Sequence, residues 1–181
     1  METYITILRG INVSGQKSIK MDALRSMFED LNFSNVTTYI QSGNVVFAEK
    51  KTKPKDLESK IQKEIKKIFG HEVSVLVKEK KEVEAVIKKN PFLKQKNIDS
   101  TRLYVTFLSH NPEQIHIDKI KDLKYPPDEF IILEKAIYLH VPISYGNSKL
   151  NNNFFENKLK VTATTRNWRT VNELLNIANA I

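Results

Sequence analysis

The sequence predicts an α+β fold of two tandem ferredoxin-like (βαββαβ) subdomains, each followed by an extra helix. Segments in which apolar residues alternate, the pattern typical of strands, occur among segments of helical periodicity in the order β-α-β-β-α-β. The same order then occurs a second time, with little identity between the two halves. A split βαβ arrangement of this kind forms an antiparallel four-stranded sheet with two helices on one face.

The first half begins with a strand, a helix and a hairpin. Residues 3–8, TYITIL, are rich in β-branched and aromatic types and predict the first strand. Residues 21–32 predict a helix, because their apolar residues recur at helical spacing. Residues 35–40 and 44–48 then predict two strands joined by a tight turn over 41–44.

A second helix, a fourth strand and a short third helix complete the first half. Pro54 suits the first turn of a helix, and Gly70 is a natural end for it. Residues 73–78 predict a strand. Residues 80–90 predict a short helix that ends before Pro91.

The second half repeats this order of elements. Its predicted strands cover residues 102–108, 128–135, 136–141 and 160–165, and its predicted helices cover residues 111–123, 148–159 and the chain from about 167 onward. We therefore expect an N-terminal ferredoxin-like subdomain over residues 1–92, a linker over 93–101 and a C-terminal ferredoxin-like subdomain over 102–181.

Composition places the chain among globular proteins and removes several kinds of site. Hydrophobic residues make up 40% and charged residues 28% of the 181 residues, which is ordinary for this class. The chain has no cysteine, so disulfides, thiolate metal sites and cysteine nucleophiles are excluded. No apolar run approaches the roughly 20 residues of a membrane span, and the N-terminus does not resemble a signal peptide. We expect a cytoplasmic protein without a membrane partner.

The net charge of +8 comes from one part of the chain. Residues 50–96 carry 15 lysines and 7 acidic residues, whereas basic and acidic residues balance in the rest. Two interpretations are open: a lysine-rich face exposed to solvent, or a surface that binds the phosphates of nucleic acids. The first is favoured, because lysine is a hydrated point charge that lacks the planar fork of arginine.

Two polar stretches of the first half are candidates for a ligand site. In LRGINVSG, Arg9, Gly10 and Asn12 follow the first strand, and the glycines allow backbone amides to face an anion. Ser42 and Asn44 lie in the tight turn between the second and third strands. The alternative for both stretches is structural, namely a glycine loop in which the chain turns and ordinary hairpin-turn residues.

A third stretch, YGNSKL, precedes a predicted helix. Asn147 is a suitable N-cap, which places Ser148 and Lys149 in the first helical turn. Free amides, a hydroxyl and an ammonium at a helix N-terminus suit a phosphate or a carboxylate. The alternative is a capped helix without a ligand.

The fourth stretch, TTRNWRTV, lies at the start of the last helix. Asn167 is a candidate cap, and Arg166 and Arg169 are spaced to share roughly one helix face. Two guanidiniums at the positive end of a helix require carboxylate partners or an incoming anion. Salt bridges between the subdomains and an anion site are equally good explanations, and Trp168 is expected to be buried.

No catalytic residue, metal site or cofactor site is predicted. The four histidines lie in different segments and form no metal-ligand spacing. Neither a dinucleotide fingerprint nor a nucleophile elbow occurs. The sequence identifies no nucleophile or general base, so it leaves open whether the protein is an enzyme, and it sets no oligomeric state.

The motifs of this chain resemble those of a known bacterial family. LRGINVSGQKSIKM, followed by LNFSNVTTYIQSGNVVF, is similar to the N-terminal signature of domain-of-unknown-function family 1697 (DUF1697). Further similar motifs are NPF at 90–92, VTFLS at 105–109, IYLHVP at 137–142, SKL at 148–150 and the TRNWRTV stretch. Ser14 departs from the glycine that the family usually has there. The resemblance implies two ferredoxin-like subdomains in tandem and no established catalytic or ligand residues.

These observations lead to three functional hypotheses. The first is binding of a small anionic ligand, a phosphate or a carboxylate, at a polar site built from the four stretches. Three of the five arginines lie there, and arginine binds such groups through two parallel hydrogen bonds. The second is a nonspecific nucleic-acid-binding module that uses the lysine-rich residues 50–96. The third is a partner-binding scaffold without a small ligand, in which the motifs serve the interface between the halves.

Overall fold

The computed structural model describes all residues from 1 to 181. The chain divides into two compact units. Unit 1 consists of residues 1–85 and 173–181, and unit 2 consists of residues 86–172. The expected subdomains over residues 1–92 and 102–181 and the linker over 93–101 stay a prediction; these units differ from them in where the third helix and the last helix are assigned.

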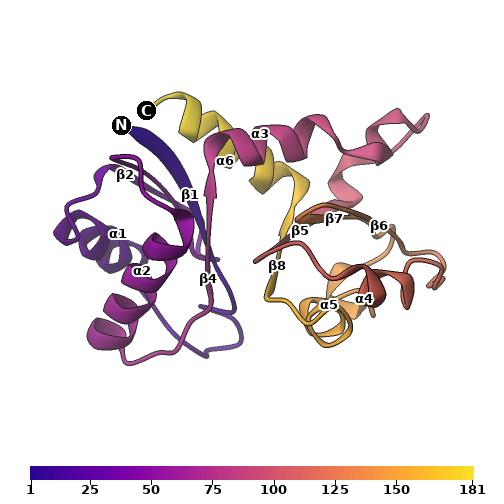
Figure 1. Ribbon diagram of the computed structural model, residues 1–181, viewed down its shortest axis with the longest axis horizontal. Coiled ribbons are helices and arrows are strands. Elements are labelled where there is room, and N and C mark those ends of the chain that lie inside the picture. Colours follow the sequence, from indigo (N-terminus) through magenta and orange to yellow (C-terminus); the bar gives the residue numbers. More distant parts are fainter. The chain divides into compact units, whose positions relative to one another are not determined.

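Unit 1 contains a four-stranded antiparallel sheet in the order β2-β3-β1-β4. Its strands are β1 (Glu2–Leu8), β2 (Ser34–Tyr39), β3 (Asn44–Glu49) and β4 (Val75–Glu79), and its helices are α1 (Met21–Asp30), α2 (Pro54–Phe69) and most of α3 (Lys80–Lys88). Helices α1 and α2 cover one face of the sheet (Figure 1). This is the predicted βαββαβ arrangement with its trailing helix.

The core of unit 1 forms because α1 and α2 each turn one apolar stripe toward the sheet. The stripe of α2 consists of Leu57, Ile61 and Ile65, which recur every four residues. Helix α2 begins with Pro54 in its first turn and ends at Gly70, whose φ of 71° continues the chain out of the helix. Both predicted ends of this helix are confirmed.

Unit 2 repeats the topology, with strand order β6-β7-β5-β8 and antiparallel neighbours throughout. Its strands are β5 (Leu103–Leu108), β6 (Glu129–Leu133), β7 (Ala136–His140) and β8 (Ala163–Asn167). Its α-helices are α4 (Gln114–Asp118), α5 (Asn152–Leu159) and the start of α6 (Trp168–Asn179), and its 3-10 turns are η1 (Pro91–Lys94), η2 (Ser100–Arg102) and η3 (Tyr145–Asn147). Helices α4 and α5 lie on the same face of the sheet (Figure 1).

The predicted helix over residues 111–123 is much shorter in the structure. Only α4 is helical, and the chain then turns, with the Ile120 amide donating to the Ile117 carbonyl at 3.0 Å. Ile117 packs against the core and Ile120 is fully buried, whereas Ile115 is 60% exposed. A helix extended over the whole segment has too few core-facing residues to be stabilised by packing.

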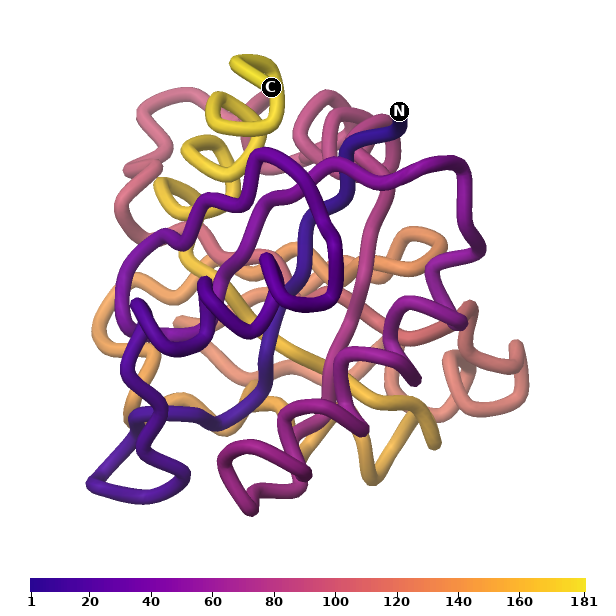
Figure 2. Tube along the Cα trace, turned by 90° about the vertical axis from the view of Figure 1, so that its left-hand side faces the viewer, coloured from indigo at the N-terminus to yellow at the C-terminus, as the bar shows by residue number.

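Both ends of the chain belong to unit 1. The first strand and residues 173–181 bring the N-terminus and the C-terminus to the same end of this unit (Figures 1 and 2). No helix in the chain has both the length and the apolar character that crossing a membrane requires.

Candidate functional site

The loop after β1 is held in place by the side chain of Asn12. Its Nδ2 donates to the carbonyls of Ile19 (2.9 Å) and Gln41 (2.8 Å), and its Oδ1 accepts from the Ile19 amide (2.8 Å). Asn12 has a φ of 55°, a left-handed conformation that asparagine adopts more readily than most residues. Arg9 is half-buried and Gly10 is exposed in the same loop. Both the amide nitrogen and the amide oxygen of the Asn12 side chain are therefore bonded to backbone groups.

The turn between β2 and β3 is bonded internally in the same way. Asn44 is fully buried, and its Nδ2 donates to the Tyr39 carbonyl (3.0 Å) and to Ser42 Oγ (2.9 Å). A buried amide side chain needs such partners, because leaving it unbonded costs about 1–3 kcal/mol. The predicted site residues Ser42 and Asn44 thus stabilise their own turn.

Gly43 brings these first two stretches together in unit 1. It has a φ of 79°, and a Cβ at this position would lie 2.7 Å from Ile11 Cδ1 and 2.8 Å from Leu8 Cβ. The Asn12–Gln41 hydrogen bond joins the same two segments. The stretches are adjacent because the turn packs directly on the loop, at a distance that only glycine allows.

Helix α5 begins later than predicted, which corrects the role expected of Asn147. The N-cap is Asn151, whose Oδ1 accepts from the Phe154 amide at 3.0 Å. Asn147 ends the single turn η3, and Ser148 has an extended backbone with a ψ of 142°. Ser148 and Lys149 therefore lie before the helix and not in its first turn.

The hydrogen bonds of Ser148 hold the extended segment before α5 in place. Its Oγ donates to Asp128 Oδ2 at 2.7 Å and accepts from the Leu150 amide at 3.0 Å. Leu150 is fully buried in the core of unit 2. The segment thus runs along the core, tied to the loop before β6, until Asn151 starts the helix.

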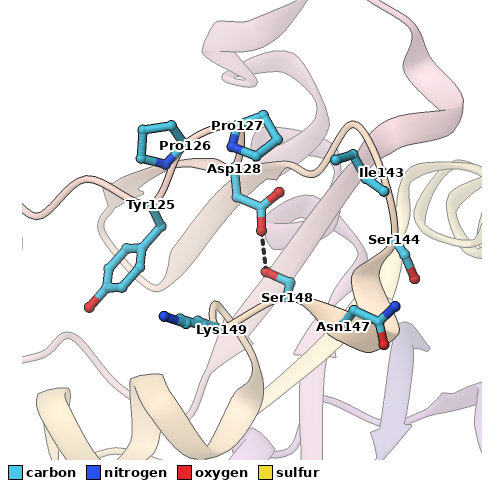
Figure 3. Close-up of a pocket in the computed structure, with 9 residues that line it drawn as sticks. All are labelled: Tyr125, Pro126, Pro127, Asp128, Ile143, Ser144, Asn147, Ser148 and Lys149. Carbon is cyan, nitrogen blue, oxygen red and sulfur yellow. Dashed lines mark hydrogen bonds between the residues drawn. The ribbon is translucent and has the colours of Figure 1, made fainter.

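Two loops enclose a cavity of about 270 Å³ in unit 2, which we call the Lys149 pocket. Residues 125–128, before β6, form one wall, and residues 143–144 and 147–149, after β7, form the other. Tyr125 and Lys149 lie on one side of it and Asn147 on the other, with the Asp128–Ser148 hydrogen bond between them (Figure 3).

The Lys149 pocket contains one positive and one negative group. Lys149 is exposed, and its ammonium makes no hydrogen bond or ion pair with the protein. Asp128 is half-buried and uses only Oδ2, so its second oxygen is unbonded. The chain has no group of three or more histidine or acidic side chains arranged to hold a metal ion.

Arg166 is a strand residue, which corrects its predicted place on a helix face. Strand β8 pairs with β5 through Arg166, opposite Val105, and continues to Asn167. Thr165 Oγ1 donates to Asn152 of α5 at 2.7 Å, so strand alternation directs Arg166 to the other face of the sheet. Arg166 is 9% exposed, and burial lowers the pKa of its guanidinium to about 10, which leaves it charged at neutral pH.

The start of α6 matches the prediction at its cap. Asn167 Oδ1 accepts from the Thr170 amide at 2.8 Å, as a capping side chain does. Trp168 is buried, as expected, and Arg169 is exposed. Arg166 and Arg169 thus belong to different elements and do not share a helix face.

The structure brings together only part of the predicted site in unit 2. Ser148 and Lys149 line the Lys149 pocket, whereas Arg166 and Arg169 do not. Asp128 and Tyr125 line it and were not predicted. The run YPPD has a turn composition, but no sequence signal pairs it with a residue 20 positions later. A single site that also includes the stretches of unit 1 stays a prediction.

Comparison with known proteins assigns the chain to a family. Residues 1–138 match a family described as a protein of unknown function (DUF1697). The solved structure of the conserved bacterial protein SP0830 from Streptococcus pneumoniae is similar, with a TM-score of 0.70, 20% sequence identity and coverage of 98% of each chain. At that identity the likeness shows the fold. No curated protein matches the sequence. The family match spans well over half of the chain, which therefore belongs to DUF1697.

Proposed function

We propose that this protein binds a small anionic ligand in the Lys149 pocket. The observation that carries the proposal is the ammonium of Lys149, which lines this cavity and has no partner in the protein. A cation that lines a cavity and forms no ion pair is available to an anionic ligand, and hydrogen bonds that involve charged groups are about twice as strong as neutral ones.

The other polar groups of the pocket suit the oxygens of such a ligand. Tyr125, Ser144 and Asn147 line it, and none of their side chains is hydrogen-bonded within the protein. Each can donate to a phosphate or carboxylate oxygen. The volume of about 270 Å³ lies near the lower end of small-molecule sites, roughly 300–1,000 Å³, and favours a ligand smaller than a nucleotide.

The proposal uses two of the residues predicted from sequence. Lys149 supplies the charge, and Ser148 joins the two walls of the pocket through its hydrogen bond to Asp128. Asn12 and Asn44 do not line this pocket; they belong to unit 1, where their side chains are bonded to the Gln41 and Tyr39 carbonyls. Participation of Arg9, Gly10, Ser42, Arg166, Asn167 or Arg169 stays a separate prediction.

Titration of the ¹⁵N-labelled chain with inorganic phosphate and with acetate, at constant ionic strength, tests the proposal. We expect saturable chemical-shift changes confined to residues 125–128 and 143–149. Lys149→Gln removes the charge and should weaken binding about tenfold, the effect of one charge-assisted hydrogen bond. Lys158→Gln is the matched control, because Lys158 is also an exposed, unpaired lysine of unit 2 that does not line the pocket.

Two results would count against the proposal. One is equal weakening by the two lysine substitutions, which indicates nonspecific attraction to positive charge. The other is a set of shift changes spread over the lysines of unit 1 with none around the Lys149 pocket.

A second candidate is nonspecific binding of nucleic-acid phosphates by unit 1. Lys17, Lys63 and Lys66 line a cavity of about 540 Å³ together with one acidic residue, Glu72. Lys66 pairs with the Glu72 carboxylate and Lys17 donates to the Glu72 carbonyl, both at 2.6 Å. Lys63 has no partner, so the cavity keeps an excess of positive charge.

Fluorescence anisotropy with labelled single-stranded DNA distinguishes this candidate from the first. Phosphate binding by lysines predicts an affinity that falls steeply between about 50 and 200 mM salt. Under this candidate Lys63→Gln weakens binding and Lys149→Gln does not. An affinity that Lys63→Gln leaves unchanged, or that does not fall with salt, counts against this candidate.

A further inference from the structure

The Lys149 pocket also contains a carboxylate, Asp128, which a purely anionic ligand would have to approach. We infer that the ligand is a zwitterion, with an acidic group for Lys149 and an amino group for Asp128, joined by a short carbon chain. This inference rests on the proposed function, since it names the class of ligand that the same pocket takes.

The Asp128 carboxylate is held in a defined orientation. Its Oδ2 accepts from Ser148 Oγ at 2.7 Å, and its backbone amide donates to the Tyr125 carbonyl at 2.8 Å. Ser148 is buried and is itself positioned by the Leu150 amide. Asp128 Oδ1 has no partner in the protein, and an ionised carboxylate accepts on both oxygens. Asp128 Oδ1 is therefore an acceptor in the pocket that is held in a fixed orientation and has no donor within the protein.

Lys149 and Asp128 line the same cavity without forming an ion pair. Each charge therefore keeps its capacity for an external partner. An anion alone would satisfy Lys149 but would be repelled by Asp128, because like charges in one pocket oppose binding. A ligand with an amino group beside its acidic group satisfies both residues and matches their zero net charge.

The remaining wall of the pocket is apolar. Pro126, Pro127 and Ile143 line it with apolar atoms, and Ile143 is 71% exposed although it is a large aliphatic residue. Figure 3 shows Pro127 and Ile143 beyond the Asp128–Ser148 pair, on the side of the cavity away from Lys149. A ligand atom that reaches past Asp128 onto this wall would remove apolar surface from water.

Matched probes that differ only in the amino group test the inference. The ¹⁵N-labelled full-length chain is titrated with glycine, γ-aminobutyrate and ε-aminocaproate, each beside its amine-free partner acetate, butyrate or caproate. Because the three zwitterions differ in the distance between their amino and carboxylate groups, the series also shows which distance the pocket binds most tightly. For the best-fitting pair we expect the zwitterion to bind about tenfold more tightly than the carboxylate, the effect of one added charge-assisted hydrogen bond.

Two substitutions show which residues cause the difference in affinity between the zwitterion and the carboxylate. Asp128→Asn keeps an acceptor for Ser148 Oγ and removes the charge, so it should reduce the preference for the zwitterion to about twofold or less. Asp122→Asn is the matched control, because Asp122 is an exposed acid of the same loop region that does not line the pocket. Lys149→Gln should weaken zwitterion and carboxylate alike.

The outcomes separate the inference from the proposed function. If each carboxylate binds as tightly as its zwitterion, and Asp128→Asn changes neither, the ligand is a simple anion and the inference is overturned while the proposed function stands. If neither series produces shift changes that depend on Lys149, both are overturned.

Discussion

Single residues of the motifs in unit 1 have structural roles that their contacts define. Asn12 and Asn44 bond backbone groups of their own loop and turn, and Gly43 packs where no side chain fits. These contacts account for Asn12, Gly43 and Asn44 without a ligand. Lys149 differs from them, because no contact within the protein accounts for it.

Gly43→Ala is expected to destabilise the protein by about 3 kcal/mol. The new Cβ would lie 2.7 Å from Ile11 Cδ1, and the φ of 79° is strained for alanine. Overpacking and left-handed strain add to each other here. Urea unfolding followed by far-ultraviolet circular dichroism measures the loss.

Gly10→Ala is the matched control for this substitution. Gly10 has a similar φ of 71°, but a Cβ there has nothing within 4 Å. Only the conformational strain remains, about 1–2 kcal/mol. Equal losses for the two variants would show that the turn does not pack on Ile11 as described.

Among the elements, side-chain hydrogen bonds cap the starts of α5 and α6 and tie α2 to its sheet. Asn151 caps α5 and Asn167 caps α6, each through its own Oδ1. Glu58 of α2 instead reaches the sheet, where its Oε1 accepts from the Val77 amide of β4 at 2.9 Å. That amide lies at the edge of the sheet of unit 1, so the carboxylate both satisfies it and ties α2 to β4.

The environment of Glu58 makes stability depend on pH. Burial raises the pKa of this carboxyl above its ordinary value, opposed in part by the Val77 hydrogen bond and by the positive charge of Lys78. The folded protein therefore holds the Glu58 proton to a higher pH than the unfolded chain does. The stability this contributes is complete below the ordinary pKa and is lost as the pH rises through the raised pKa.

Glu58→Gln should cancel that loss. Glutamine keeps an acceptor for the Val77 amide and has no charge to bury. The unfolding free energy of the variant, minus that of the wild type, is therefore expected to increase between the ordinary pKa of 4.5 and about pH 7. Urea unfolding at a series of pH values measures the difference. A difference that is constant or decreases with pH would contradict the direction of the pKa shift.

At the scale of the whole molecule, the chain uses one sheet topology twice and returns at its end to the unit in which it began. Helix α6 starts in unit 2, but residues 173–181 belong to unit 1. Within unit 1, Ala180 and Ile181 line a cavity of about 500 Å³ together with Arg25 of α1 and Val36 of β2. The first and last segments of the chain thus contribute to the same unit.

A fragment of residues 1–92, the first expected subdomain, lacks residues 173–181, which belong to unit 1. We expect its amides to exchange with solvent about tenfold or more faster than the same amides in the full chain, because part of unit 1 is missing. Hydrogen exchange measured by mass spectrometry tests this. Attaching residues 173–181 to the fragment through a flexible linker should restore protection. Equal exchange in the fragment and the full chain would instead support residues 1–92 as an independent domain.

The type and order of the elements and the limits of α2 follow from local patterns in the sequence. Periodicity records which face of an element is buried, and Pro54 and Gly70 act on the backbone where they stand. The tertiary structure alone decided the start of α5, the burial of Arg166 and the composition of the Lys149 pocket. These depend on contacts such as Ser148–Asp128, between residues far apart in the chain, which a local pattern does not encode.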